Sequence, residues 1–299
     1  MDETNKLQYS KKIAEVTNTM EYFDDISIDD VTVIVPTLDE EEAIPFVLDD
    51  IITQGYENIL VVDGNSQDKT LEIVKQKNVR YITQKGKGKT GAISSALEHI
   101  KTPYIALIDG DCTYAAKDIQ NMFPYINKYD QVIGVRSEGR KNISKLNRFG
   151  NWVINNYFNI LFDTKLSDIC SGMYLLKTNY AKNLQLKTDG FDVEVEIAAN
   201  SAKNKSIIEV PIDFFARVGN QKLNPWTDGL KILKTITKLA LKLQTLRSAS
   251  FFTALLIFPG LLSLLFFPSA RIGMIFIILS IQGTSLLYVD SKFLKKESS

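Results

Sequence analysis

The sequence predicts an α/β fold in which helices cover both faces of a doubly wound sheet. The first observation is a series of short, β-rich apolar runs, which are typical of parallel strands buried on both faces. These runs are 31–36 (VTVIVP), 59–63 (ILVVD), 79–83 (VRYIT), 104–109 (YIALID) and 131–135 (QVIGV). The second observation is that stretches of helical length separate the runs, at 39–54, 68–77, 89–100 and 117–127. Strands that alternate with helices in this way predict a wound sheet.

The carboxyl ends of the runs carry polar residues, and ligands of wound sheets bind beyond the carboxyl ends of the strands. The segments found there are PTLDE at 36–40, DGNSQD at 63–68, QKGKGKTG at 84–91 and DGD at 109–111. After residue 136 the periodicity weakens. We expect a helix at 145–162, a loop at 168–172, a helix at 192–201 and a strand at 206–212. This second part is predicted to extend the sheet and to close over the site.

Composition divides the chain into a polar arm (1–30), an α/β domain (31–223), an amphipathic segment (224–248), an apolar segment (249–291) and a basic tail (292–299). We expect the amphipathic segment to be a helix at a membrane interface, with packing on the protein's own core as the alternative. The apolar segment holds two runs, Phe251–Phe267 and Ile272–Val289, of 17 and 18 residues. Such runs are near the minimum for spanning a bilayer and predict a two-helix transmembrane hairpin. A buried or re-entrant hairpin is the alternative.

Charge and cysteine content narrow the class of protein further. The 35 basic and 35 acidic residues balance, which favours neither a nucleic-acid binder nor an acidic tail protein. The N-terminus is polar and acidic, unlike a secretory signal, and Cys112 and Cys170 lack metal-type spacing. Basic residues flank both ends of the predicted hairpin, which places both ends in the cytosol. We therefore expect an integral membrane protein whose α/β domain is cytosolic.

Asp109 and Asp111 end a buried apolar run, with only Gly110 between them. Two carboxylates at the ligand-binding edge of a sheet are hard oxygen donors, which suit Mg²⁺ or Mn²⁺ shared with a diphosphate. A metal there stabilises the charge that develops on a departing nucleoside diphosphate. A surface loop that carries two acids by chance is the alternative interpretation.

The stretch from Gly86 to Gly91 (GKGKTG) matches GxGxxG, follows a strand and opens a helix. A Rossmann dehydrogenase is therefore an alternative, although the motif follows the third strand and the acid expected downstream is the DGD itself. A Walker A motif fails because Thr83 stands where its first glycine belongs. We interpret the loop as a backbone and lysine cradle near a diphosphate, formed by Gly88 and Lys89, and an ordinary helix N-terminus is the alternative.

Several of these motifs occur together in a known order. They are VTVIVPTLDEEEAI, ILVVDGNSQDKT, the GKG loop, YIALIDGD, the DxxSG box at 168–172 and EVPIDFFARVGNQKL at 209–223. Over residues 31–223 the chain resembles family-2 glycosyltransferases of GT-A fold, which have a Rossmann-like doubly wound mixed sheet. More narrowly, it is similar to dolichyl-phosphate mannose synthases and their archaeal polyprenyl-phosphate relatives, which act in protein glycosylation. The predicted hairpin is similar to the anchors of some of these enzymes.

The resemblance implies a role for each matching residue. It implies a nucleotide-sugar site formed by Pro36, Asp39, Glu40, Asp63, Gly88, Lys89, Asp109, Arg217 and Lys222. It also implies that Asp109 and Asp111 bind Mg²⁺ or Mn²⁺ and that Arg136 and Arg148 bind the acceptor phosphate. We assign catalytic roles to Asp111, Arg217 and Asp168, and for Asp168 a structural loop cap is an equal alternative.

Three positions depart from the pattern of the mannose synthases. Leu38 replaces a tyrosine, Gly64 replaces an acid and Thr113 replaces a glutamine. The first two changes lie at the base pocket and the third lies at the metal, so the donor is left open. We expect GDP-mannose first, with UDP-glucose or UDP-N-acetylglucosamine as the alternatives.

The expected acceptor is a dolichyl or polyprenyl phosphate in the membrane. A sugar hydroxyl acceptor needs a general base, whereas a lipid phosphate is already ionised and needs positioning by arginine. The single histidine, His99, lies in a predicted helix, where it is expected to be solvated. We therefore expect one inverting displacement at the cytosolic membrane face. The rivals are a processive polysaccharide synthase, whose QxxRW segment is missing from this chain, and an inactive membrane scaffold derived from a transferase.

Overall fold

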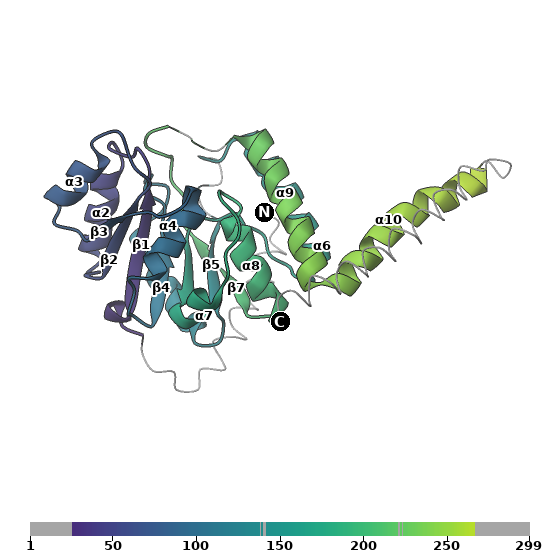
Figure 1. Cartoon of the computed structure of the whole chain (residues 1–299), viewed down its shortest axis with the longest axis horizontal. Coiled ribbons are helices and arrows are strands. Elements are labelled where there is room, and N and C mark those ends of the chain that lie inside the picture. Colours follow the sequence, from purple (N-terminus) through teal and green to yellow (C-terminus); the bar gives the residue numbers. More distant parts are fainter. Residues whose placement is uncertain (1–25, 138, 140–141, 221, 223, 267–299) are drawn as a thin grey trace.

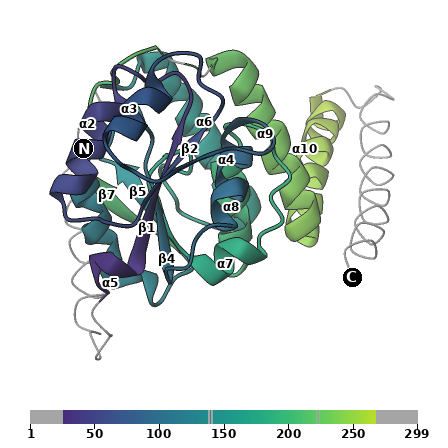
Figure 2. The same ribbon diagram turned by 60° about the vertical axis from the view of Figure 1, so that its left-hand side comes forward.

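The computed structural model describes residues 26–137, 139, 142–220, 222 and 224–266, and in this part a seven-stranded sheet lies between two layers of helices (Figures 1 and 2). The strands follow the order β3-β2-β1-β4-β6-β5-β7. Their bounds are Val31–Thr37 (β1), Ile59–Asp63 (β2), Tyr81–Thr83 (β3), Tyr104–Leu107 (β4), Gln131–Arg136 (β5), Tyr174–Lys177 (β6) and Ile207–Ile212 (β7). All six predicted strands are therefore confirmed.

One strand of the sheet, β6, was not predicted. It is antiparallel to both of its neighbours, β4 and β5, whereas the other paired strands are parallel. The sheet is therefore mixed, as the resemblance implied. The four residues YLLK are too short a run to identify a strand by periodicity, and the pairing partners are distant in sequence.

Helices cover each face of the sheet and pack on their own apolar cluster. One face carries α2 (Ile44–Thr53), α3 (Thr70–Gln76), the 3₁₀ helix η2 (Ala116–Met122) and α5 (Phe123–Ile126). The other carries α4 (Gly88–Leu97), α6 (Lys145–Phe162), α7 (Thr178–Asn183), α8 (Val193–Lys203) and α9 (Pro225–Leu243). A further 3₁₀ helix, η1 (Ile28–Asp30), precedes β1. The helix predicted at 117–127 is thus divided in two, because Pro124 lacks the N–H that a continuous helix needs.

The apolar face of α9 packs on the protein rather than facing a membrane. Ile232, Ile236 and Ala240, spaced four residues apart, are buried in the cluster that α6 and α8 also form. Tyr157 of α6 and Thr237 of α9 also share a hydrogen bond between their hydroxyls at 2.8 Å. The predicted amphipathic helix exists, but the prediction that its apolar face meets a membrane was wrong, because α6 and α8 cover that face.

Helix α10 (Thr245–Phe266) follows α9 after Gln244 and projects away from the domain (Figure 1). Within the described residues, none of the helices combines the length and the apolar character that a membrane span requires. The predicted hairpin is therefore not supported by this part of the chain. Its second run, 272–289, lies outside the described residues.

The packing of α9 gives a first prediction. Ile236→Ala removes a fully buried side chain from the cluster with α6 and α8, and we expect a loss of about 2–5 kcal/mol in the free energy of unfolding. Urea denaturation measures this loss. The control is Leu230→Ala on the exposed side of the same helix, which we expect to change stability by less than about 0.5 kcal/mol. Equal losses in the two variants would contradict the packing.

Candidate functional site

The carboxyl ends of three neighbouring strands bring the predicted site residues to one edge of the sheet. Thr37 at the end of β1 pairs with Asp63 at the end of β2, and the DGD loop follows β4, which pairs with β1 on the other side. Pro36 lies within β1, with Asp39 and Glu40 in the loop just after it. Parallel strands end at the same edge, so the winding of the sheet creates the site.

Hydrogen bonds join the loop after β1 to the loop after β2. The backbone N–H of Asp39 donates to Ser66 Oγ at 2.9 Å, and the Asp39 carboxylate accepts the N–H of Gln67 at 2.7 Å. The N–H of Glu40 donates to Thr70 Oγ1 at 2.8 Å. Asp63 accepts the N–H groups of its own loop at Asn65 and Ser66. These contacts fix the two loops that are predicted to bind the nucleotide.

Gly64 is one of the positions that depart from the mannose synthase pattern, and its surroundings leave little room for a side chain. Its N–H donates to the carbonyl of Thr37 at 2.7 Å. A Cβ atom at position 64 would lie 3.1 Å from that carbonyl oxygen and 3.3 Å from the Leu38 side chain. The two departures at Leu38 and Gly64 are therefore in contact and alter the same part of the predicted base pocket.

Asp109 is held by a buried lysine from the glycine loop. Lys89 Nζ lies 2.5 Å from Asp109 Oδ1 and 2.6 Å from Glu194 Oε1, at the start of α8. Burial opposes the charge on Lys89, but the carboxylates of Asp109 and Glu194 outweigh it and raise the lysine pKa well above its usual value. Lys89 is thus a fixed cation at the diphosphate end of the predicted site.

Gly88 begins α4 with a φ of +58°, and a Cβ atom there would lie 2.4 Å from the carbonyl oxygen of Asp189. Both the left-handed backbone and the close approach require glycine. This helix start follows the carboxyl end of β3, at the edge where a diphosphate is predicted to bind, and helix N-termini commonly bind anions.

Asp111 is the more buried acid of the pair, and it has different partners. The guanidinium of Arg217 forms an ion pair with Asp111 Oδ2. Thr113 donates to Asp111 Oδ1 through both its N–H, at 3.0 Å, and its hydroxyl, at 2.5 Å. Burial and the neighbouring charge of Asp109 raise the Asp111 pKa. Thr113, which replaces a glutamine of the mannose synthases, therefore orients Asp111 directly.

The segment after β7 brings Arg217 and Lys222 to the site from far along the chain. Phe215 N–H donates to the Thr113 carbonyl at 2.9 Å, and Val218 N–H donates to the Asp111 carbonyl at 3.0 Å. Lys222 forms an ion pair with Glu40, and Arg217 Nη1 lies 3.7 Å from the same carboxylate. Burial raises the Glu40 pKa, while Lys222 opposes the shift. Arg217 thus links the β1 loop to the DGD loop.

The glycine of the DxxSG box, Gly172, packs against the Asp109 carboxylate. A Cβ atom at position 172 would lie 2.0 Å from Asp109 Oδ2, so only glycine leaves room for that carboxylate. The N–H of Gly172 donates to the hydroxyl of Tyr114 at 2.8 Å. Tyr114 is buried, and burial raises its pKa to about 12. The box therefore packs directly against the DGD loop.

Asp168 and Arg136, for which separate roles were predicted, form one buried ion pair. Arg136 Nε donates to Asp168 Oδ2 at 2.6 Å, and Nη2 donates to Oδ1 at 2.5 Å. Such a two-point pair fixes both side chains. Arg136 therefore holds the DxxSG loop in place. Arg148, in the first turns of α6, is exposed, and among the described residues it forms no ion pair with this network.

Several supporting residues carried no predicted role. Glu209 on β7 accepts the N–H groups of Ser167 and Asp168, both at 2.7 Å. Asn155 of α6 accepts the N–H of Ile169 at 3.0 Å. Glu209 is a charged residue in an otherwise apolar strand, and this is the signal that could have identified it, whereas Asn155 is one of several asparagines in its helix. Their partners are known only from the folded chain.

The acid pair fits a divalent cation. No group of three His, Cys, Asp or Glu side chains that would hold a metal occurs among the described residues. Mg²⁺ needs only one or two carboxylates when substrate phosphates and waters supply the other ligands. Asp109 and Asp111 provide those carboxylates. Burial and then the charge of Asp109 raise the Asp111 pKa, and a bound cation would offset both effects.

Two further carboxylate oxygens remain without a hydrogen-bond partner among the described residues. They are Glu40 Oε2 and Glu194 Oε2, both buried at the site. Buried polar atoms normally have partners. A bound substrate with hydroxyl groups would supply them.

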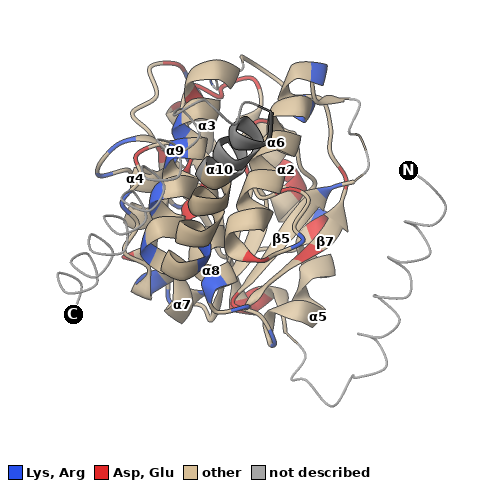
Figure 3. Ribbon diagram, turned by 90° about the vertical axis from the view of Figure 1, so that its right-hand side faces the viewer, with Lys and Arg blue, Asp and Glu red and all other residues tan. Residues whose placement is uncertain are grey.

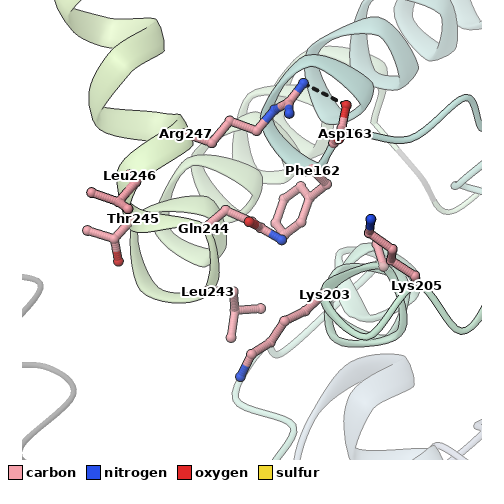
Figure 4. A pocket seen from close by; sticks show the side chains of 10 residues that line it. Phe162, Asp163, Lys203, Lys205, Leu243, Gln244, Thr245, Leu246 and Arg247 are labelled. Carbon is pink, nitrogen blue, oxygen red and sulfur yellow. Dashed lines mark ion pairs between the residues drawn. The ribbon is translucent and has the colours of Figure 1, made fainter.

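A cavity of about 370 Å³ lies away from this edge, where α9 meets α10 (Figure 4). It is lined by Phe162, Asp163, Ala202, Lys203, Lys205, Leu243, Gln244, Thr245, Leu246 and Arg247. These residues lie at the C-terminal ends of α6, α8 and α9 and at the start of α10, whereas the site lies near the start of α8. The cavity shares no residue with the predicted site.

Comparisons with known proteins agree with this geometry. The family model described as glycosyl transferase family 2 matches residues 32–184. Glycosyltransferase AglJ of Haloferax volcanii is 35% identical over 209 residues, covering 67% of this chain and 69% of the relative. A dolichyl-phosphate hexose transferase of the same organism is 32% identical over 221 residues, covering 72% of this chain and 96% of the relative.

Solved structures show the same fold. Glucosyl-3-phosphoglycerate synthase from Mycobacterium tuberculosis, in complex with uridine diphosphate, superposes with a TM-score of 0.60 at 15% identity. The match covers 74% of this chain and 86% of that protein. The same enzyme in complex with Mn²⁺, UDP-glucose and phosphoglyceric acid superposes with a TM-score of 0.58. From its family match, its two Haloferax relatives and its GT-A-like sheet, the chain belongs to glycosyl transferase family 2 and is a glycosyltransferase.

Proposed function

We propose that this glycosyltransferase transfers a hexose from a nucleotide sugar to a dolichyl or polyprenyl phosphate at the cytosolic face of a membrane. The observation that carries the proposal is the arrangement of Asp109 and Asp111, each paired with a basic residue from another part of the chain. The name of the 32% identical relative, a dolichyl-phosphate hexose transferase, supports the acceptor class.

The donor diphosphate lies between the DGD loop, the start of α4 and the segment after β7. Arg217 and Lys222 bind its oxygens, since both are fixed at this edge yet about a third of each side chain is exposed. The free N–H groups at the start of α4 add further donors. Asp109 and Asp111 would hold Mg²⁺ or Mn²⁺, which neutralises charge on the departing diphosphate.

The acceptor needs no general base. A non-bridging oxygen of the lipid phosphate is already ionised and forms the new bond to the anomeric carbon. The bond from that carbon to the donor diphosphate breaks, and its electron pair leaves with the nucleoside diphosphate. One displacement of this kind inverts the configuration at the anomeric carbon. His99 follows the C-terminal end of α4, whereas the site lies at the start of that helix.

Arginine positions the acceptor phosphate, because its planar fork suits phosphate oxygens. Arg148 is the exposed candidate near the start of α6. The bidentate pair of Arg136 with Asp168 gives Arg136 a positioning role, in which it fixes the loop that contacts the DGD segment. The donor is proposed as GDP-mannose first, with UDP-glucose and UDP-N-acetylglucosamine as alternatives.

Transfer of label to lipid tests this function. Membranes containing the protein, Mn²⁺, a polyprenyl phosphate and each of the three labelled nucleotide sugars should yield an organic-extractable labelled lipid with one donor. We expect Asp111→Asn to lower this labelling by a factor of about 10² or more, since it removes a carboxylate that would hold the cation that neutralises the departing diphosphate. Asp49→Asn, an exposed acid paired with Lys77, is the control and should retain activity. No labelled lipid with any donor would favour the inactive scaffold instead.

The contact between Gly172 and Asp109 gives a second test. Gly172→Ala places a methyl group where the Asp109 carboxylate lies, so we expect a large loss of activity from displacement of that acid. Gly150→Ala is the matched control, because nothing lies within 4 Å of a Cβ atom at that helical position. It should leave activity unchanged and raise stability by about 0.5–1 kcal/mol. Full activity in Gly172→Ala would show that the position of Asp109 is not critical.

A further inference from the structure

Five large apolar side chains are exposed at the N-terminal ends of α6 and α9. They are Leu146, Phe149 and Trp152 of α6 and Trp226 and Leu230 of α9, and we call them the aromatic rim. Trp226 is 70% exposed and Phe149 is 63% exposed. Phe149 and Trp152 stack on each other with ring centroids 6.0 Å apart. Single exposed apolar residues are ordinary, but a group of this size on neighbouring helices indicates an interaction surface.

The α6 residues and the α9 residues of the rim lie at similar positions along their two helices. The hydroxyl contact between Tyr157 and Thr237 joins residues that are both twelve positions beyond the helix starts at Lys145 and Pro225. Both helices lie in one layer and start at the same end of the domain (Figure 1). The first turns of α6 and α9 are therefore neighbours, which brings the five exposed side chains to one end of this layer.

The rim also adjoins the catalytic edge. Lys222, which pairs with Glu40, precedes the start of α9 by three residues. Asn142, just before α6, donates to the carbonyl of Phe214 at 2.9 Å, in the segment that carries Arg217. A surface that binds the rim is thus brought close to the site.

The charge on the two helices that carry the rim is mainly positive. Helices α6 and α9 contain six basic residues, Lys145, Arg148, Lys231, Lys234, Lys238 and Lys242, and one acid, Asp228. Lys234 and Lys238 are exposed and continue the Trp226–Leu230 stripe at four-residue spacing. Among the ion pairs of the described residues, Lys231 is the one of these six that has acidic partners, Asp189 and Asp192. Tryptophan and leucine beside unpaired lysines fit the interface of an anionic bilayer.

Helix α10 projects from the side of the domain on which α6 and α9 lie. Figure 3 views the molecule from the side to which α10 projects, and α6 and α9 lie on that side. Phe251 of α10 packs edge-on against Tyr157 of α6, which fixes the base of the helix to the same layer. Helix α10 therefore leaves the same helical layer that carries the aromatic rim, from the C-terminal end of α9, whereas the rim lies at its N-terminal end.

We propose that the aromatic rim inserts into the interfacial region of an anionic membrane and orients the catalytic edge toward lipid. Trp152 and Trp226 lie at the level of the lipid headgroups, where indole rings are favoured because one end is apolar and the N–H is polar. The lysines further along α9 contact lipid phosphates. The inference deepens the proposed function, because it brings the site to a lipid-borne acceptor.

Tryptophan fluorescence tests the rim directly, since Trp152 and Trp226 are the two tryptophans of the chain. The full chain is placed in nanodiscs of anionic phospholipid, with or without bromine atoms near the head end of the acyl chains. We expect the brominated lipid to quench each residue, measured one at a time in Trp226→Phe and Trp152→Phe. Because no sugar donor is needed, failure here is distinguishable from failure of the proposed transfer.

The matched control uses the opposite helical layer. Phe46 of α2 is 65% exposed, like the rim residues. With both natural tryptophans replaced by phenylalanine, Phe46→Trp should remain unquenched in the same nanodiscs. Equal quenching at all three positions, or none at the rim, would overturn the proposal. A concentration-dependent blue shift in detergent, without quenching by brominated lipid, would overturn it too, because the rim would then bind a second copy of the chain.

Discussion

The site depends on charge compensation around the acidic loop after β4. Asp109 and Asp111 are two residues apart, and burial together with the charge of Asp109 raises the pKa of Asp111. Lys89 and Arg217 balance the two carboxylates from opposite sides. Like charges at such a separation are costly in a partly buried place unless cations are near. The positions of the glycine loop and of the segment after β7 follow from this requirement.

Two glycines leave the space that the contacts of the acidic loop after β4 require. Gly172 leaves room for the Asp109 carboxylate, and Gly88 lets the start of α4 approach the backbone at Asp189. A side chain at either position would separate elements that the electrostatic contacts draw together. Close packing and charge pairing therefore act on the same few residues, and the active edge is rigid where its acids and its lysine meet.

The helices α6 and α9 each have a buried face and an exposed face, and we propose different roles for the two. Helices α6 and α9 use one face to cover the sheet and leave the other face, with its aromatic residues and lysines, to the outside. Both helices begin near the segment that carries Arg217, so the proposed membrane contact and the proposed chemistry share one end of the domain. The cavity at the α9–α10 junction lies at the other end of these helices and is separate from both.

The sequence alone determined the wound sheet, the edge at which the acids lie and the family, because buried strands and motif order are local patterns. It also predicted Asp109, Asp111, Lys89 and Arg217 as site residues from their motifs, and the structure brings these four side chains together. Only the tertiary structure decided their partners: Arg136 binds Asp168, Thr113 orients Asp111, and the four residues of β6 complete the sheet. It also turned the apolar face of α9 inward, onto α6 and α8. An amphipathic pattern shows that a helix has an apolar face, but what covers that face depends on contacts between residues far apart in the chain.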